Sequence, residues 1–142
     1  MRLYLDTSLV VSALVQEQAS EAVHDWLASR GGIRFAVSDW VVVEFAAALS
    51  RKRALNEISA GLREEAQFQF DSLTAGEFDV LPVTRGEFRI GANLAGLSLQ
   101  GLRAGDALHL AIAKSNTLTL CTRDIKLAAA GTDLGCSTQL IG

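Results

Sequence analysis

Two acidic side chains lie in apolar runs, where an ordinary surface role is difficult to assign. Glu44 lies within the apolar run at 41–49, and Asp106 directly precedes the apolar run at 107–113. Both runs are apolar nearly all round as helices, so we expect both to be well buried. A buried ionised carboxylate is costly unless it is paired or bound to a cation. Each residue taken alone could instead cap a helix, form one half of a buried ion pair or lie at a solvent-exposed edge of its helix.

Two further acidic residues come just after predicted strands. Asp6 follows the short apolar run at 3–5, and Asp124 follows the segment at 118–123. In an open parallel sheet, ligands bind at the carboxyl ends of strands, although each of these residues could also cap a helix. If these two meet Glu44 and Asp106, the four carboxylates repel one another, and a divalent cation would compensate. Ligands that are all oxygen favour Mg²⁺ or Mn²⁺ over Zn²⁺.

Strands and helices alternate along the whole chain. We predict strands at 3–5, 33–37, 78–83, 118–121 and 137–141. We predict helices at 9–15, 20–29, 39–52, 56–73, 84–97, 106–116 and 124–130, with a loop at 97–105. This alternation predicts an α/β fold, a three-layer α/β/α sandwich with a mostly parallel central sheet. No linker or repeat interrupts it, so residues 1–142 are expected to form a single domain.

Composition is that of one ordinary globular domain. The 142 residues are 49% hydrophobic and 20% charged, which excludes disorder of the chain as a whole. The net charge of −3 disfavours nucleic-acid binding through bulk positive charge. Cys121 and Cys136 suit buried thiols in a reducing compartment, and His24 and His109 are too far apart in the sequence for a zinc site with them. No run approaches the roughly 18 apolar residues of a membrane span, so a cytoplasmic protein is expected.

Four segments that carry these residues resemble, in their order, a known family. They are Leu5-Asp6-Thr7-Ser8-Leu9-Val10, Ser38 followed six residues later by Glu44, Leu102-Arg103-Ala104-Gly105-Asp106-Ala107-Leu108-His109-Leu110-Ala111, and Leu120-Cys121-Thr122-Arg123-Asp124. Together they resemble the PIN-domain proteins, most closely the VapC-like toxin ribonucleases of bacterial type II toxin–antitoxin pairs. The segment from Arg103 to Ala111 is the most specific of the four.

The resemblance implies an acidic metal pocket, Mg²⁺- or Mn²⁺-dependent endonuclease activity on RNA, and a cognate VapB-like antitoxin that blocks the site. The family's acidic positions are matched by Asp6, Glu44, Asp106 and Asp124, and its hydroxyl positions by Ser8 and Thr122. The sequence departs from the family at Gly105, where Pro is frequent, which would loosen the start of that helix. The fourth acidic position varies among such proteins.

The mechanism expected from these residues needs no protein nucleophile. Asp6 and Asp106 would be the primary metal ligands, directly or through water, and Glu44 and Asp124 would complete the pocket or orient water. The cation would activate water for in-line attack on phosphorus. Ser8 would donate a hydrogen bond, cap the first helix, or do both.

Several cations could line the path of an RNA phosphate backbone towards these acidic side chains. They are Arg51, Lys52, Arg53, Arg85, Arg89, Arg103, Arg123 and Lys126. We favour Arg123, beside Asp124, and Arg103 for substrate binding. His109 is expected on the same helix face as Asp106, where a satisfied core histidine is favoured over a general acid.

Other protein classes remain open. A receiver-like regulatory domain also has an acidic Mg²⁺ pocket, but it needs paired acidic residues after the first strand, and Asp6 stands alone. A haloacid-dehalogenase-like phosphatase needs Asp-x-Asp, and position 8 is Ser. A non-catalytic module of the same fold, or a PIN-type nuclease that is not a toxin, is also possible. The mean hydropathy of +0.25 suggests apolar surface for a homodimer and for an antitoxin segment across Asn56–Leu73.

Overall fold

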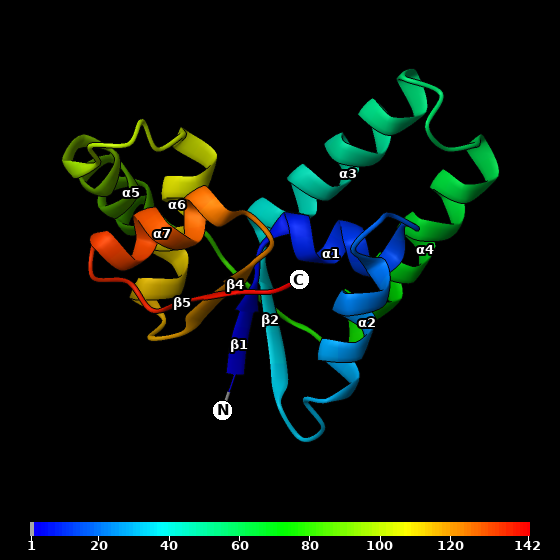
Figure 1. The fold of residues 1–142 in the computed structure, drawn as a ribbon, viewed down its shortest axis with the longest axis horizontal. Coiled ribbons are helices and arrows are strands. Elements are labelled where there is room, and N and C mark those ends of the chain that lie inside the picture. The colour runs from blue at the N-terminus through cyan, green and yellow to red at the C-terminus, as the bar shows by residue number, and fades with distance from the viewer. Residues whose placement is uncertain (1) are drawn as a thin grey trace.

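A computed structural model describes residues 2–142. Its elements are β1 (Arg2–Leu5), α1 (Thr7–Leu14), α2 (Ser20–Ala28), β2 (Arg34–Ser38), α3 (Asp39–Ala54), α4 (Ala60–Gly76), β3 (Asp79–Leu81), α5 (Arg85–Leu97), α6 (Ala104–Ser115), β4 (Thr119–Thr122), α7 (Ile125–Asp133) and β5 (Thr138–Leu140). The strands form one sheet in the order β3-β2-β1-β4-β5, and every pairing is parallel (Figure 1). The predicted α/β/α fold is confirmed. None of the helices described is both long and apolar enough to cross a membrane.

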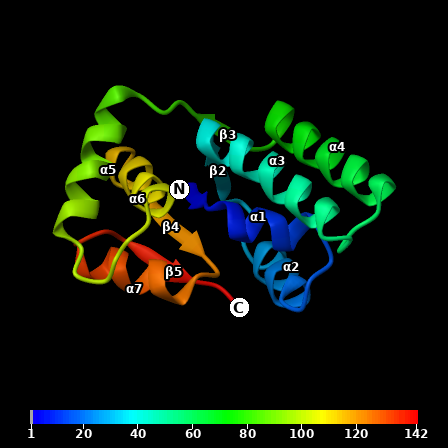
Figure 2. The same ribbon diagram turned by 90° about the horizontal axis from the view of Figure 1, so that it is seen from above.

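The strand order reverses direction between β1 and β4. The chain adds β2 and then β3 on one side of β1, and afterwards returns to add β4 and β5 on the other side. Because crossovers between parallel strands are right-handed, this reversal sends α1–α4 to one face and α5–α7 to the other (Figure 2). At such a point the connections after two neighbouring strands diverge, and a crevice opens at the carboxyl ends of the strands. The fold therefore places a candidate binding crevice beyond β1 and β4.

The core occupies both faces of the sheet. Tyr4 of β1, Val37 of β2 and Leu120 of β4 are 0% exposed, and so are Leu110 and Ile112 of α6. A parallel sheet covered on both faces needs apolar side chains in both directions, which is why its strands are short apolar runs. The burial on both sides holds the carboxyl ends of β1 and β4 in fixed positions.

Three helices begin directly after a strand, because a polar side chain at the junction caps the helix. The caps are Asp6 for α1, Ser38 for α3 and Asp124 for α7, and each accepts a hydrogen bond from a backbone N–H of the first turn. A cap of this kind stabilises a helix by about 1 kcal/mol. Since at most two residues separate strand from helix at these junctions, the cap side chains are held at the carboxyl edge of the sheet.

Three helix starts differ by two or more residues from the predicted positions, and the first is α1, which begins at Thr7 instead of 9. Helix α4 begins at Ala60 instead of 56, because Asn56 takes a left-handed backbone conformation (φ 58°) and Ser59 caps the helix. Helix α6 begins at Ala104, so Asp106 lies within its first turn and does not open it. An acidic side chain is favourable there, because the N-terminal end of a helix carries a partial positive charge.

Candidate acidic site at the carboxyl ends of β1 and β4

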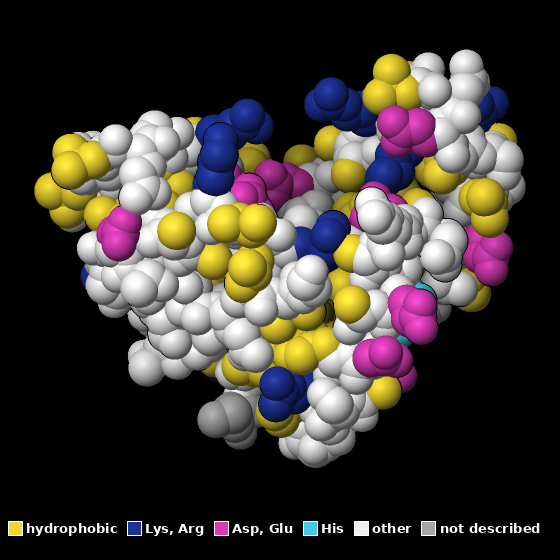
Figure 3. Space-filling model, in the orientation of Figure 1, with side chains coloured by type: hydrophobic (Ala, Val, Ile, Leu, Met, Phe, Trp, Pro, Cys, Tyr) yellow, Lys and Arg dark blue, Asp and Glu magenta, His cyan; other side chains and the backbone are white. Residues whose placement is uncertain are grey.

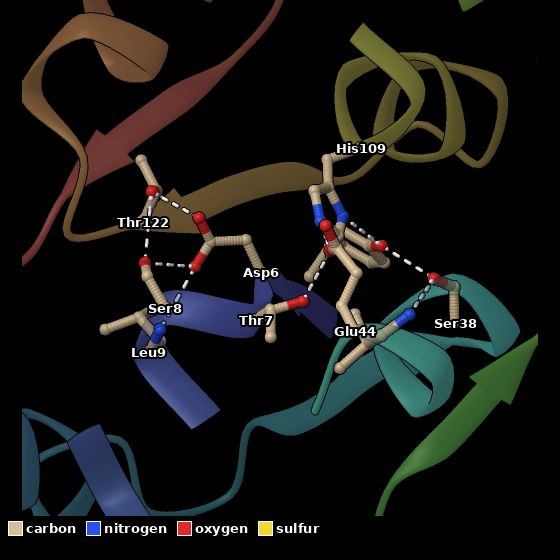
Figure 4. Close-up of polar contacts among 10 residues, drawn as sticks. Asp6, Thr7, Ser8, Leu9, Ser38, Glu44, His109 and Thr122 are labelled. Atoms are coloured by element: carbon tan, nitrogen blue, oxygen red, sulfur yellow. Dashed lines mark hydrogen bonds and ion pairs between the residues drawn. The ribbon is translucent and has the colours of Figure 1, made fainter. Parts of the chain in front are cut away.

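Asp6 is the most buried of the four predicted acidic residues, with 3% of its surface exposed. Its Oδ1 accepts hydrogen bonds from Ser8 Oγ (2.7 Å) and Leu9 N (3.1 Å), and its Oδ2 accepts one from the Thr122 hydroxyl (Figure 4). Burial raises the pKa of Asp6, and these donors offset only part of that rise. The site therefore holds this carboxylate rigidly in a place where its negative charge is disfavoured.

The two hydroxyls beside Asp6 come from different elements. Ser8 lies in the first turn of α1, whereas Thr122 ends β4. Each also accepts a backbone N–H from the segment after β4, Ser8 from Arg123 (3.2 Å) and Thr122 from Asp124 (3.0 Å). Both hydroxyls thus tie the end of β1 to the end of β4 across the crevice.

Glu44 reaches the same crevice from α3. Its Oε1 accepts hydrogen bonds from Thr7 Oγ1 (2.7 Å) and from His109 Nε2 (2.5 Å), and its side chain is 30% exposed (Figure 4). Burial raises the pKa of Glu44, but the His109 and Thr7 donors outweigh it, and the pKa lies below its ordinary value. A Cβ at Gly105 would lie 3.2 Å from Glu44 Oε2, so the missing side chain lets α6 approach this carboxylate closely.

Asp106 and Asp124 come from the other half of the chain, and Asp124 is the most exposed of the four. Asp106 is partly buried on α6, and Asp124 is exposed at the start of α7. Burial raises the pKa of Asp106, and the charges of Asp124, Asp6 and Glu44 raise it further. The other three carboxylates therefore act electrostatically on Asp106 across the crevice.

An open cleft of about 500 Å³ adjoins this site. Asp106 and Asp124 line it together with two cations, Arg103 and Lys126. Figure 3 shows the notch between the two halves of the molecule, with acidic side chains at its floor and Lys or Arg side chains on both sides. Negative charge at the floor and positive charge at the rim suit a ligand that binds through both a cation and its own anionic groups.

Arg123 does not line this cleft, although the sequence favoured it for substrate binding. Its guanidinium turns towards α1, where Nη1 lies 3.5 Å from Ser12 Oγ. Ser12 in turn donates to Glu17 (2.7 Å), and Glu17 pairs with Lys52 (2.8 Å). Arg123 thus belongs to a polar network that links the start of α7 to α1 and α3. Of the two favoured arginines, only Arg103 borders the cleft.

The donor set suits a hard divalent cation. Within residues 2–142, no group of three Asp, Glu, His or Cys side chains is arranged so that it could hold a metal ion by itself. Asp6 and Glu44 direct oxygens to hydroxyl and imidazole donors instead. Mg²⁺ needs no cage of three protein ligands, because it keeps several waters and binds through one or two carboxylates. The raised pKa of Asp106, to which the charges of Asp124, Asp6 and Glu44 contribute, favours such a cation beside it.

The sequence analysis gave three members of this site no role in it. Thr7 donates to Glu44, and Tyr4 and Ser38 lie behind His109. Thr7 lies within the Asp-Thr-Ser segment and could have been noticed there. Tyr4 looks like an ordinary strand residue and Ser38 like an ordinary helix cap. Nothing in the neighbouring sequence indicates that they also form hydrogen bonds behind His109.

Comparisons with known proteins agree with this geometry. The profile that describes the PIN domain matches residues 3–132. No curated protein matches the chain.

Three solved structures share the fold over nearly the whole chain. VapBC2 from Rickettsia felis, bound to a promoter DNA fragment, has 18% identity over 100% of both chains and a TM-score of 0.74. FitAcB from Neisseria gonorrhoeae has 21% identity over 97% of this chain and 96% of that one (TM-score 0.73). VapC20 from Mycobacterium tuberculosis, a toxin that cleaves the sarcin–ricin loop, has 16% identity over 91% and 95% (TM-score 0.74).

Proposed function

The chain belongs to the PIN-domain family, and from this premise we propose that it is a divalent-metal-dependent endoribonuclease and the toxin of a bacterial toxin–antitoxin pair. The observation that supports the proposal is that Asp106 and Asp124 line one cleft, with Asp6 and Glu44 near enough for their charges to raise the pKa of Asp106. Membership of this family argues against the receiver-like and phosphatase alternatives.

Asp6 and Asp106 are the residues that would hold Mg²⁺ or Mn²⁺, with Glu44 and Asp124 beside them. The bound cation would supply Lewis-acid chemistry, which activates water and stabilises the charge that develops on a phosphodiester. The other residues prepare this site. Ser8 and Thr122 orient the Asp6 carboxylate, and their hydroxyls serve as donors to it and not as nucleophiles.

Metal removal should abolish cleavage. We expect the purified protein to cut RNA in the presence of Mn²⁺ or Mg²⁺ and to stop when EDTA is added. Without the cation, the negatively charged carboxylates repel the phosphate that must approach them. Cleavage of an RNA mixture is followed by gel electrophoresis, and excess Mn²⁺ added back should restore it. Cleavage that continues unchanged in EDTA would contradict the metal-dependent assignment.

Substrate binding should depend on the two cations of the cleft. Arg103→Ala combined with Lys126→Ala is expected to weaken RNA binding and to make it less salt-dependent. The slope of log K against log salt should fall by about 0.7 for each phosphate of a single strand that the protein no longer neutralises. Binding of an uncleaved RNA to metal-loaded protein is measured between low and physiological salt. Lys114→Ala, an exposed change in the last turn of α6, is the matched control. Equal salt slopes in all three proteins would show that Arg103 and Lys126 do not contact phosphate.

The toxin role implies a partner, and a groove of about 450 Å³ between α1 and α4 fits one. Leu14, Ile58, Leu62 and Ala66 line it, and Leu62 is 55% exposed. An antitoxin segment with apolar side chains would cover this surface within the predicted Asn56–Leu73 region. We also propose that the protein acts in the cytoplasm and forms a homodimer.

Induced expression in a bacterial host should arrest growth, and co-expression of the antitoxin should relieve the arrest.

A further inference from the structure

We infer that His109, held by Tyr4 and Ser38, is a positioning residue that fixes the Glu44 carboxylate at the acidic site. The inference rests on the proposed function, because it assigns His109 a task in that reaction. His109 is 2% exposed, and both of its ring nitrogens have partners inside the protein. The ring therefore cannot reach a substrate, and any effect it has on the reaction must pass through Glu44.

A continuous chain of buried hydrogen bonds ends on Glu44. Ser38 Oγ lies 2.8 Å from the Tyr4 hydroxyl, which lies 2.9 Å from His109 Nδ1. His109 Nε2 lies 2.5 Å from Glu44 Oε1. Tyr4 and Ser38 are both 0% exposed, so water does not compete for these contacts. Removal of a link in such a chain leaves a buried polar group without a partner.

The donors and acceptors in this chain follow from the chemistry of its two ends. A carboxylate only accepts hydrogen bonds, so His109 Nε2 must carry a proton and donate a hydrogen bond to Glu44. In the neutral ring Nδ1 then accepts from the Tyr4 hydroxyl. Ser38 Oγ accepts the Val41 backbone N–H (3.3 Å), which leaves its own proton for the Tyr4 oxygen. Every group has a partner of the opposite kind, and the imidazole has one permitted orientation.

The contact joins the two halves of the molecule. His109 belongs to α6 and Glu44 to α3, which lie on opposite faces of the sheet (Figure 2). Figure 4 shows the two side chains meeting above the end of β1. Because Glu44 is 30% exposed, its side chain could otherwise rotate into solvent. The imidazole prevents this and keeps α3 and α6 in register at the crevice.

The geometry also selects which oxygen of Glu44 faces the site. Thr7 and His109 both donate to Oε1. No hydrogen bond to Oε2 occurs among the described residues, and Oε2 faces Gly105, the neighbour of Asp106. His109 thus anchors one oxygen and leaves the other beside the first turn of α6, which carries Asp106. Groups that orient a metal-site carboxylate in this way typically affect activity by about 10- to 100-fold when they are replaced.

Kinetics of folded variants tests the inference. We expect His109→Leu and Tyr4→Phe to lower kcat for RNA cleavage by about 10- to 100-fold with little change in KM. His109→Gln, whose amide can still donate to Glu44, should recover part of that activity. Ser20→Ala is the matched control, because it removes a buried hydroxyl (1% exposed) that bonds to Val15 O and has no link to Glu44. It should lower the thermal midpoint as Tyr4→Phe does and leave kcat unchanged.

A spectroscopic readout separates this inference from the proposed function. In the metal-free protein, the imidazole ¹⁵N spectrum should show His109 protonated at Nε2, and Glu44→Ala should shift that Nε2–H signal. A folded Tyr4→Phe variant with kcat within twofold of the wild type, or an Nε2–H signal unaffected by Glu44→Ala, would overturn the positioning role. If the wild type cuts no RNA at all, the proposed function fails, and the Nε2–H signal still decides whether His109 holds Glu44.

Discussion

Asp106→Asn is expected to reduce RNA cleavage by more than about a hundredfold, because groups that merely orient metal ligands already account for 10- to 100-fold. Its stability should be unchanged or higher. Burial and the charges of Asp124, Asp6 and Glu44 raise the pKa of Asp106 in the folded protein. A carboxyl with a raised folded-state pKa stabilises the protein at low pH and loses that contribution as pH rises through the folded pKa. A neutral amide therefore removes a repulsion at neutral pH.

Single-turnover cleavage and thermal unfolding, measured on the same samples, check this result. The matched control is Asp25→Asn, which makes the same chemical change on the exposed surface of α2 and should cleave RNA like the wild type. For Asp106→Asn, cleavage should fall while the thermal midpoint stays the same or rises, as expected where function maintains an unfavourable charge cluster. Full cleavage by folded Asp106→Asn would remove this residue from the proposed metal site.

Phe45→Ala is expected to lower the free energy of unfolding by about 3–5 kcal/mol, as large-to-small changes in tightly packed cores do. Phe45 is 0% exposed, and its ring stacks on Phe70 with centroids 4.4 Å apart and planes at 21°. This pair holds α3 against α4. The decrease is a large fraction of the roughly 5–15 kcal/mol that stabilises a typical domain. Because Glu44 precedes Phe45 on α3, the same change should also disturb the acidic site.

Urea unfolding followed by circular dichroism measures this effect. The control is Phe68→Ala on α4, whose side chain is 72% exposed and which should change stability by no more than about 0.5 kcal/mol. A decrease below about 1 kcal/mol for Phe45→Ala would mean that the packing of α3 on α4 is not part of the core. Similar decreases in the two variants would lead to the same conclusion.

Local sequence patterns were sufficient for the fold class and for most elements. Hydrophobic periodicity and cap residues act over a few positions, so they are readable without knowledge of the rest of the chain. The junctions at Asp6 and Asp124 illustrate this, since each has a capping acidic residue between a short strand and a helix in both the sequence and the structure. The start of α4 was misplaced because the left-handed conformation of Asn56 has no signal in the periodicity.

The amino-acid sequence by itself determined which residues could do chemistry here, since four carboxylates in apolar runs or after strands are visible from type and position alone. Only the tertiary structure decided how they are held. The order β3-β2-β1-β4-β5 brings α3 and α6 to opposite faces of the same sheet edge, and this lets His109 contact Glu44 from 65 residues away. The side-chain direction of Arg123, towards Ser12 and away from the cleft, was decided in the same way. Such contacts depend on strand order and packing between distant segments, which no local pattern of residues specifies.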